Sequence, residues 1–187
     1  DHTYQCCAPD KNQHYVIDHS SKSPEADETR NILKEAARIA RGNILDIKRI
    51  KASDFEAVVF PGGLGAALNL CNFAQKGEAC DIDPDIEKLI HDFHDSGKWI
   101  VAICIAPALI ARAFKSKKQV TLTIGNDTAT AAKIQKLGAR HQNCPVNQAI
   151  VDRENRIITT PAYMLATCIG DVFEGIEAAI KALSEKI

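Results

Sequence analysis

The sequence lacks a surplus of either charge. Its 187 residues include 23 Lys and Arg against 24 Asp and Glu, which gives a formal net charge of −1. Proteins that bind nucleic acid through its phosphates usually carry a basic patch or stripe. The short basic pairs Lys48-Arg49 and Lys117-Lys118 do not form one and read as solvated surface. We therefore expect no nucleic-acid partner.

Long apolar segments are also missing. Crossing a bilayer takes about 18 consecutive apolar residues or more, and no run in the sequence approaches that length. The segment from Asp1 to Asp18 is polar and mixed, so it does not have the pattern of a signal peptide. We expect no membrane partner and a cytoplasmic location, or a mitochondrial one if the source is eukaryotic.

Paired cysteine motifs are absent, although the chain has seven cysteines. No two of them have C-x-x-C spacing, which leaves zinc ribbons and thioredoxin-like redox sites unsupported. An odd count would also leave one thiol over in a fully disulfide-bonded secreted protein. We expect free thiols in a reducing compartment. All the cysteines except Cys104 are expected to be packing residues: Cys6, Cys7, Cys71, Cys80, Cys144 and Cys168.

What the sequence does contain is an alternation of strand and helix patterns. Short apolar runs bounded by turn residues predict buried parallel strands at 56–60 and 99–103. Asp83 and Pro84 predict the start of an amphipathic helix, because Asp caps helices and Pro suits the first turn. Further strands are expected at 3–8 and 120–124, a hairpin at 146–151 and 156–160, and helices at 27–42, 106–114, 128–137 and 163–184. The alternation predicts a single α/β domain over residues 1–187, with a mostly parallel sheet covered by helices on both faces and a β-hairpin near the C-terminus.

Two details of these helices are also predicted. The helix at 128–137 is expected to have a Thr cap. The last helix is expected to turn five apolar side chains toward the core: Ile169, Val172, Phe173, Ile176 and Ile180.

Cys104 occupies the position of a nucleophile elbow. It follows the apolar strand pattern at 99–103 and precedes a helix pattern that begins near Ala106. The unpaired N–H groups and partial positive charge of a helix N-terminus favour a thiolate there. The alternative is a buried structural cysteine, which is common.

A glycine pair follows the other buried strand. In open parallel sheets ligands bind beyond the carboxyl ends of the strands, and Gly62 and Gly63 stand at such an end. Glycines let a backbone approach a ligand closely, so their N–H groups and that of Ile105 are expected to hold an oxyanion beside Cys104. The alternative is a tight turn without a ligand. The glycines form neither a dinucleotide fingerprint nor a phosphate loop.

At this point the residues resemble a known family, the PfpI superfamily, which is related to class I glutamine amidotransferases. Within it, the chain is most similar to the ElbB group, named for enhanced lycopene biosynthesis and described in places as glyoxalase. The segments that carry the resemblance are spread over nearly the whole chain: Glu28-Thr29-Arg30-Asn31, Val58-Val59-Phe60-Pro61-Gly62-Gly63, Ala102-Ile103-Cys104-Ile105-Ala106-Pro107 and Thr159-Thr160-Pro161-Ala162-Tyr163-Met164.

The resemblance implies a flavodoxin-like fold and a cysteine enzyme that needs no cofactor. It implies that Cys104 is the nucleophile and that Gly63 and Ile105 are oxyanion donors. It further implies a strand–helix unit, about 30 residues long, that would precede the given sequence and carry a Glu beside the cysteine. Because the single Met is Met164, the sequence is expected to begin inside a longer product.

Several features of related enzymes are missing. PfpI-type proteases have His directly after the cysteine, where this chain has Ile105, and the downstream His and Glu of amidotransferases are not found. His141 is expected to be a surface or loop residue rather than a base. His91 and His94 are spaced i, i+3 but have no evident Cys or carboxylate partner, so we expect no metal site.

The interpretation that fits these residues is a glyoxalase III-type lyase that converts small reactive 2-oxoaldehydes to 2-hydroxy acids. Two alternatives stay open. One is a redox-sensing or stress protein without catalysis, in which Cys104 is oxidised. The other is an amidotransferase-like subunit that serves a partner enzyme. By analogy with relatives, a homodimer is expected.

Overall fold

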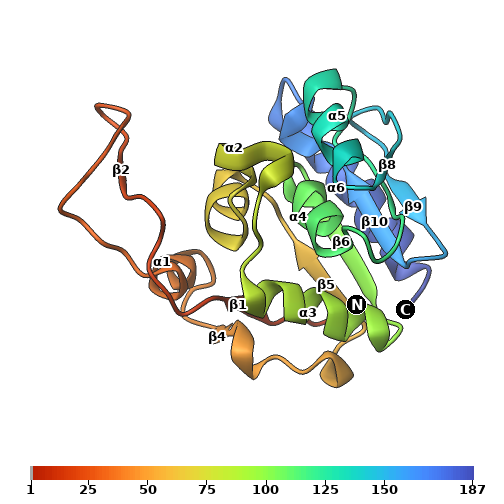
Figure 1. Ribbon diagram of the computed structural model, residues 1–187. Helices are drawn as coiled ribbons and strands as arrows, with labels where there is room; N and C mark the ends of the chain where they lie inside the picture. Colours follow the sequence, from red (N-terminus) through yellow and green to blue (C-terminus); the bar gives the residue numbers. More distant parts are fainter. Residues whose placement is uncertain (1) are drawn as a thin grey trace. The chain divides into compact units, whose positions relative to one another are not determined.

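The structure is a computed structural model that describes residues 2–187. The chain divides into two compact units, one ending at Lys51 and the other comprising Ala52–Ile187 (Figure 1). The expectation of a single domain remains a prediction.

The first unit contains a parallel pair of short strands. Strand β1 (Cys6–Ala8) pairs with β4 (Ile44–Asp46), and helix α1 (Ile32–Ile39) connects them along the chain. Two further strands, β2 (Ile17–Asp18) and β3 (Ser23–Pro24), form an antiparallel hairpin. The sequence did not predict this hairpin, whose turn is closed by the Asp18 carboxylate accepting a hydrogen bond from the N–H of Ser20 at 2.8 Å.

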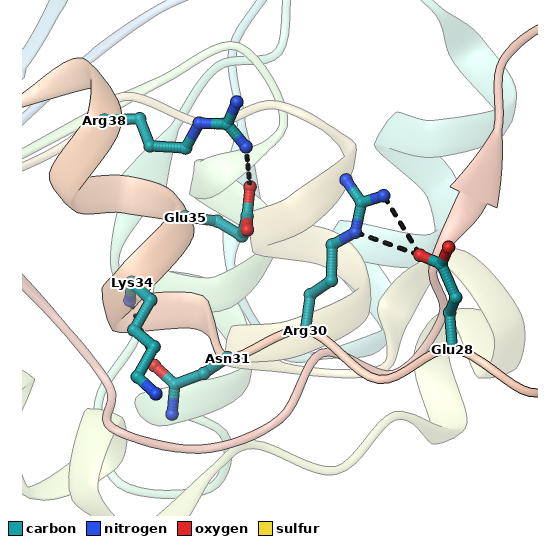
Figure 2. Close-up of polar contacts among 6 residues, drawn as sticks. All are labelled: Glu28, Arg30, Asn31, Lys34, Glu35 and Arg38. Atoms are coloured by element: carbon teal, nitrogen blue, oxygen red, sulfur yellow. Dashed lines mark hydrogen bonds and ion pairs between the residues drawn. The ribbon is translucent and has the colours of Figure 1, made fainter.

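The start of α1 explains one of the segments that carry the family resemblance. The Asn31 side chain caps the helix by accepting a hydrogen bond from the N–H of Lys34 at 3.0 Å. Arg30 pairs with Glu28 at 3.0 Å, and Arg38 pairs with Glu35 at 3.1 Å (Figure 2). These ion pairs are largely exposed and contribute little stability. Within residues 28–31, Asn31 is therefore the residue that caps α1.

The second unit is built on a four-stranded sheet with the order β5-β6-β10-β9. Strands β5 (Ala57–Phe60), β6 (Trp99–Ile103) and β10 (Ile157–Thr160) are parallel, while β9 (Ile150–Asp152) pairs antiparallel with β10. The predicted strands and the predicted hairpin are thus confirmed. Of the two strands predicted to be buried, β6 is buried along its whole length, whereas Val59 of β5 is exposed. A separate parallel pair consists of β7 (Thr121–Leu122) and β8 (Arg140–His141).

Helices pack against both faces of β6. Alternate residues of the strand point to opposite faces, and Trp99, Val101 and Ile103 share a core cluster with Val172 and Ala179 of α6 (Ile169–Ser184). Helices α3 (Pro84–Asp95) and α4 (Ala106–Ala113) contact the same strand and lie on the other side of the sheet from α6 (Figure 1). The site described below therefore rests on a strand whose five residues are all buried.

Helix α3 begins as the sequence predicts. The carboxylate of Asp83 accepts hydrogen bonds from the N–H groups of Asp85 and Ile86, and Pro84 stands in the first turn. The predicted Thr cap of helix α5 (Thr128–Lys136) is wrong. The capping residue is Asp127, whose carboxylate accepts a hydrogen bond from the N–H of Thr130 at 2.8 Å. The remaining short elements are η1 (Ile47–Arg49), η2 (Ala52–Asp54), the π-helical η3 (Ala66–Leu70), α2 (Phe73–Lys76), η4 (Gly77–Ala79) and η5 (Ala162–Met164).

The last helix buries only part of the face predicted for it. Of the five apolar residues expected to face inward, Val172 is buried and Ile176 packs against the core cluster, but Ile169, Phe173 and Ile180 are exposed. Small residues explain the difference. The Cα of Gly175 lies so close to the backbone of Val146 that an added Cβ would stand 2.2 Å from the carbonyl oxygen of that residue. The helix thus approaches the sheet through Gly175 and Ala179.

Candidate active site

Cys104 lies directly after β6, in a backbone conformation that non-glycine residues rarely adopt. Its φ is +61°, in the left-handed region, which costs an L-residue about 1–2 kcal/mol. The N–H of Cys104 donates to the carbonyl of Thr160 at 3.0 Å, so the turn is tied to the end of β10. Strain of this kind persists where the surrounding structure fixes it, and it clusters at functional sites.

The chain after Cys104 enters α4 without a side-chain cap. Ile105 is the N-cap residue, and its side chain makes no capping hydrogen bond. Within residues 2–187, the N–H of Ile105 donates no hydrogen bond. A free N–H at the start of a helix is a donor for an anionic ligand. The predicted elbow is therefore present, between a buried strand and a helix N-terminus.

Gly62 packs directly against this elbow. A Cβ added to Gly62 would lie 2.3 Å from the carbonyl oxygen of Ile103 and 3.0 Å from the Cβ of Cys104. Only glycine permits this approach, and its φ of +86° also requires glycine. Gly63 has a φ of +80°, but an added Cβ would meet nothing within 4 Å. Gly62 thus packs against the turn at Cys104, whereas the space next to the Cα of Gly63 is open.

The third strand end at this edge belongs to β10. Thr159 and Thr160 are fully buried, and the Thr160 hydroxyl donates to the carbonyl of Gln148 at 2.8 Å. Ala162 is buried with a φ of +45°, a second non-glycine residue in the left-handed region, and it belongs to the core cluster against which Cys104 packs. These residues were not predicted to belong to the site. The sequence feature that could have indicated them is the run Thr159-Thr160-Pro161-Ala162, which follows apolar strand residues.

The thiol of Cys104 is half-buried and is not part of a disulfide. In the part of the chain that the structure describes, it makes no hydrogen bond to a carboxylate or an imidazole. The imidazole of His141 is engaged elsewhere, because its Nε2 accepts a hydrogen bond from the N–H of Ile124 at 3.3 Å. Burial lowers the pKa of His141, which favours the neutral acceptor form.

The other histidines singled out by the sequence do have partners. His91 lies 3.8 Å from a carboxylate oxygen of Glu87, and His94 lies 3.1 Å from one of Asp95. Both rings also contact the edge or face of Phe114. Among residues 2–187, no group of three or more His, Cys, Asp or Glu side chains is placed to hold a metal ion.

The remaining cysteines divide by environment. All seven are free thiols, and Cys71, Cys80 and Cys144 are buried as expected of packing residues. Burial raises the pKa of the Cys71 thiol to about 11, and burial also raises the pKa of Cys80 and of Cys144. The expectation that Cys168 is a packing residue is wrong, because this cysteine is exposed at the N-cap of α6.

Sequence comparison relates this chain to a known family and to curated proteins. Residues 38–163 match the DJ-1/PfpI family. The human protein named glutamine amidotransferase-like class 1 domain-containing protein 3, mitochondrial, is 40% identical over 97% of this chain and 70% of its own length. The rat ES1 protein homolog, mitochondrial, is 39% identical over 95% of this chain and 69% of its own length.

Solved structures agree with these matches. A crystal structure described as an isoprenoid biosynthesis protein with amidotransferase-like domain, from Ehrlichia chaffeensis, has a TM-score of 0.89 and 36% identity, covering 98% of this chain and 83% of that one. A DJ-1 superfamily protein from Salmonella typhimurium, with a TM-score of 0.53 and 17% identity over 97% of this chain and 72% of its own, shares the fold. The flavodoxin-like α/β fold is confirmed, and no helix in residues 2–187 has the length and apolar character to cross a membrane. The chain belongs to the DJ-1/PfpI family.

Proposed function

We propose that this protein is a cysteine-dependent, glyoxalase-like enzyme that acts on small 2-oxoaldehydes and uses no cofactor. The observation that carries the proposal is the strained φ of +61° at Cys104, held between a buried strand and the N-terminus of α4. A half-buried thiol in that position meets the requirements for a nucleophile. Family membership supports the proposal, since the DJ-1/PfpI superfamily includes glyoxalases and stress proteins.

The chemistry begins with a covalent addition. The thiolate of Cys104 attacks the aldehyde carbon of a substrate such as methylglyoxal, and the carbonyl oxygen becomes an oxyanion. The N–H groups of Gly63 and Ile105 are proposed to donate to that oxyanion, with Gly62 holding the turn in place. Removing one such donor from an oxyanion hole typically costs about 100- to 1,000-fold in turnover.

The second stage moves a proton and adds water. A carboxylic acid/base group transfers the proton from the former aldehyde carbon to the neighbouring carbon through an enediol, which leaves a thioester on Cys104. Water hydrolyses the thioester, so the net reaction adds one water to the 2-oxoaldehyde and yields a 2-hydroxy acid. The acid/base residue is not assigned to any position of this chain.

The redox-sensing alternative is favoured by one specific observation. The Cys104 thiol has no carboxylate or imidazole partner within residues 2–187, and oxidation to sulfenic or sulfinic acid needs only an accessible thiolate. The names of the human and Ehrlichia relatives instead suggest an amidotransferase-like subunit. His141 does not support that alternative as a catalytic base, because its Nε2 already accepts from Ile124.

Turnover of methylglyoxal separates these functions. Purified protein is incubated with methylglyoxal without glutathione, and lactate is measured for the wild type, Cys104→Ser and Cys80→Ser. The proposal predicts lactate from the wild type and Cys80→Ser, with at least about a 1,000-fold loss in Cys104→Ser. Absence of lactate from the wild type, together with peroxide oxidation confined to Cys104, would instead establish the sensor.

Two further expectations belong with this function. The human and rat relatives are named as mitochondrial proteins, and we propose the same location for this chain in a eukaryotic source. A homodimer and a small carbonyl substrate also remain proposals.

A further inference from the structure

A basic hollow lies away from Cys104, at the point where α4 and α5 end. It has a volume of about 380 Å³, and its polar lining side chains are Lys115, Ser116, Lys117, Lys118, Gln119 and Lys136. Five of these residues follow α4 directly, and Lys136 is the last residue of α5. In the sequence, Lys117-Lys118 looks like an isolated pair, but the fold adds Lys136 to it from a distant segment.

The positive charges of the hollow exceed the negative charges that reach them. Among the residues that the structure describes, no Asp or Glu lines it. Lys136 pairs with Glu78 at 2.9 Å and Lys117 pairs with Glu87 at 3.5 Å. Lys118 has no ion pair or side-chain hydrogen bond in residues 2–187. Two carboxylates therefore face four ammonium groups.

The location of these lysines at two helix ends explains only part of why they are clustered. A lysine near a helix C-terminus interacts favourably with the helix dipole, but here the carbonyl of Phe114 already accepts from the N–H groups of Lys117 and Lys118. Surface ion pairs with Glu78 and Glu87 contribute little in water. A multiply charged anion would neutralise the surplus and would occupy the concave surface.

We propose that this hollow binds a small polyanion that carries two or more phosphate-type charges. Its volume lies in the range of small-molecule sites, about 300–1,000 Å³, which favours a compact ligand such as a diphosphate group over an extended polymer. Ammonium groups bind phosphate oxygens as point charges. The ligand competes with the carboxylates of Glu78 and Glu87 for Lys136 and Lys117.

Titration with inorganic pyrophosphate, followed by backbone amide NMR at constant ionic strength, tests the proposal. The expected result is saturable shift changes at residues 115–119 and 136–138. Affinity should fall at least tenfold in the double variant Lys115→Glu/Lys118→Glu and rise in Glu78→Gln, because that variant frees Lys136. The matched control is Lys34→Glu/Lys51→Glu, which changes the net charge equally at exposed positions of the first unit.

Three results would overturn the proposal. One is the absence of saturable shifts at millimolar pyrophosphate, and another is an equal loss of affinity in the control variant. The third is binding of the wild type to vesicles containing anionic lipid without any response to pyrophosphate. Lys115→Gln/Lys118→Gln, which adds no negative charge, repeats the test if the Glu variant unfolds.

Discussion

Two thiol regions of the second unit show how backbone placement, rather than residue type, sets the chemistry of a cysteine. Cys104 is half-buried at a φ of +61°, beside a glycine and a helix N-terminus. Cys71 is buried, its Sγ donates to the carbonyl of Ala66 at 3.6 Å, and burial raises its pKa to about 11. Both residues follow short elements and both are free thiols. Only the first region has the accessibility and the open backbone donor that a nucleophile requires.

The largest predicted effect distinguishes the two glycines beside Cys104. Gly62→Ala should lower the free energy of unfolding by about 3 kcal/mol, because the new Cβ meets the Ile103 carbonyl and the φ of +86° is unfavourable. Gly63→Ala meets open space, so only the φ cost of about 1–2 kcal/mol applies. Urea denaturation measures both values, and equal losses would show that Gly62 does not pack against the elbow.

The second effect tests the buried region through alkaline pH. The pKa of Cys71 rises from 9.0 to about 11 on folding, so the folded state holds its proton more tightly. Stability from this group is complete below pH 9 and is lost as the pH rises toward 11, by about 2–3 kcal/mol at about 1.4 kcal/mol per pKa unit. Cys71→Ala should flatten this part of the stability curve. An unchanged slope between pH 9 and 11 would contradict the assignment.

The third effect tests the strain at Cys104. A left-handed backbone conformation is less costly for glycine than for alanine. The free energy of unfolding should therefore be about 1 kcal/mol higher for Cys104→Gly than for Cys104→Ala. The control pair is Ala108 and Ala108→Gly inside α4, where glycine should be the less stable residue by about 1 kcal/mol. If alanine were also the better residue at position 104, the elbow would not be strained.

The smallest effect concerns His141. Burial lowers its pKa below the ordinary value of 6.5, so the unfolded state binds a proton that the folded state does not. The stability from neutral His141 is present above about pH 6.5 and is lost as the pH falls. His141→Gln should reduce this acid-side loss and leave the alkylation rate of Cys104 unchanged. Slower alkylation of Cys104 in that variant would indicate that His141 acts as its base.

Sequence patterns predicted the parts of the fold that local physics determines. Short apolar runs predicted β5 and β6, and the Asp83-Pro84 pair predicted the start of α3, because these signals act within a few residues. The position of Cys104 was predictable for the same reason. Its strain and its hydrogen bond to Thr160 were not, since they depend on the packing of β10 against β6.

Other features depended on contacts distant in sequence. The inward face of α6 was predicted only in part. The apolar residues Ile169, Phe173 and Ile180 are exposed, because the helix approaches Val146 through Gly175. Cys168 was expected to pack because cysteine usually does, but the N-cap of α6 leaves it exposed. The basic hollow likewise needs Lys136 beside a segment about 20 residues earlier in the chain.

Competitive alkylation determines whether Cys104 is the reactive thiol of the folded protein. The folded protein is treated at neutral pH with a low dose of iodoacetamide, and peptide mapping measures the modified fraction of each of the seven cysteines. We predict that Cys104 is modified first, well before buried Cys71, Cys80 and Cys144 and ahead of exposed Cys168, which lacks the elbow. Uniform modification, or modification led by Cys71, Cys80 or Cys168, would contradict it.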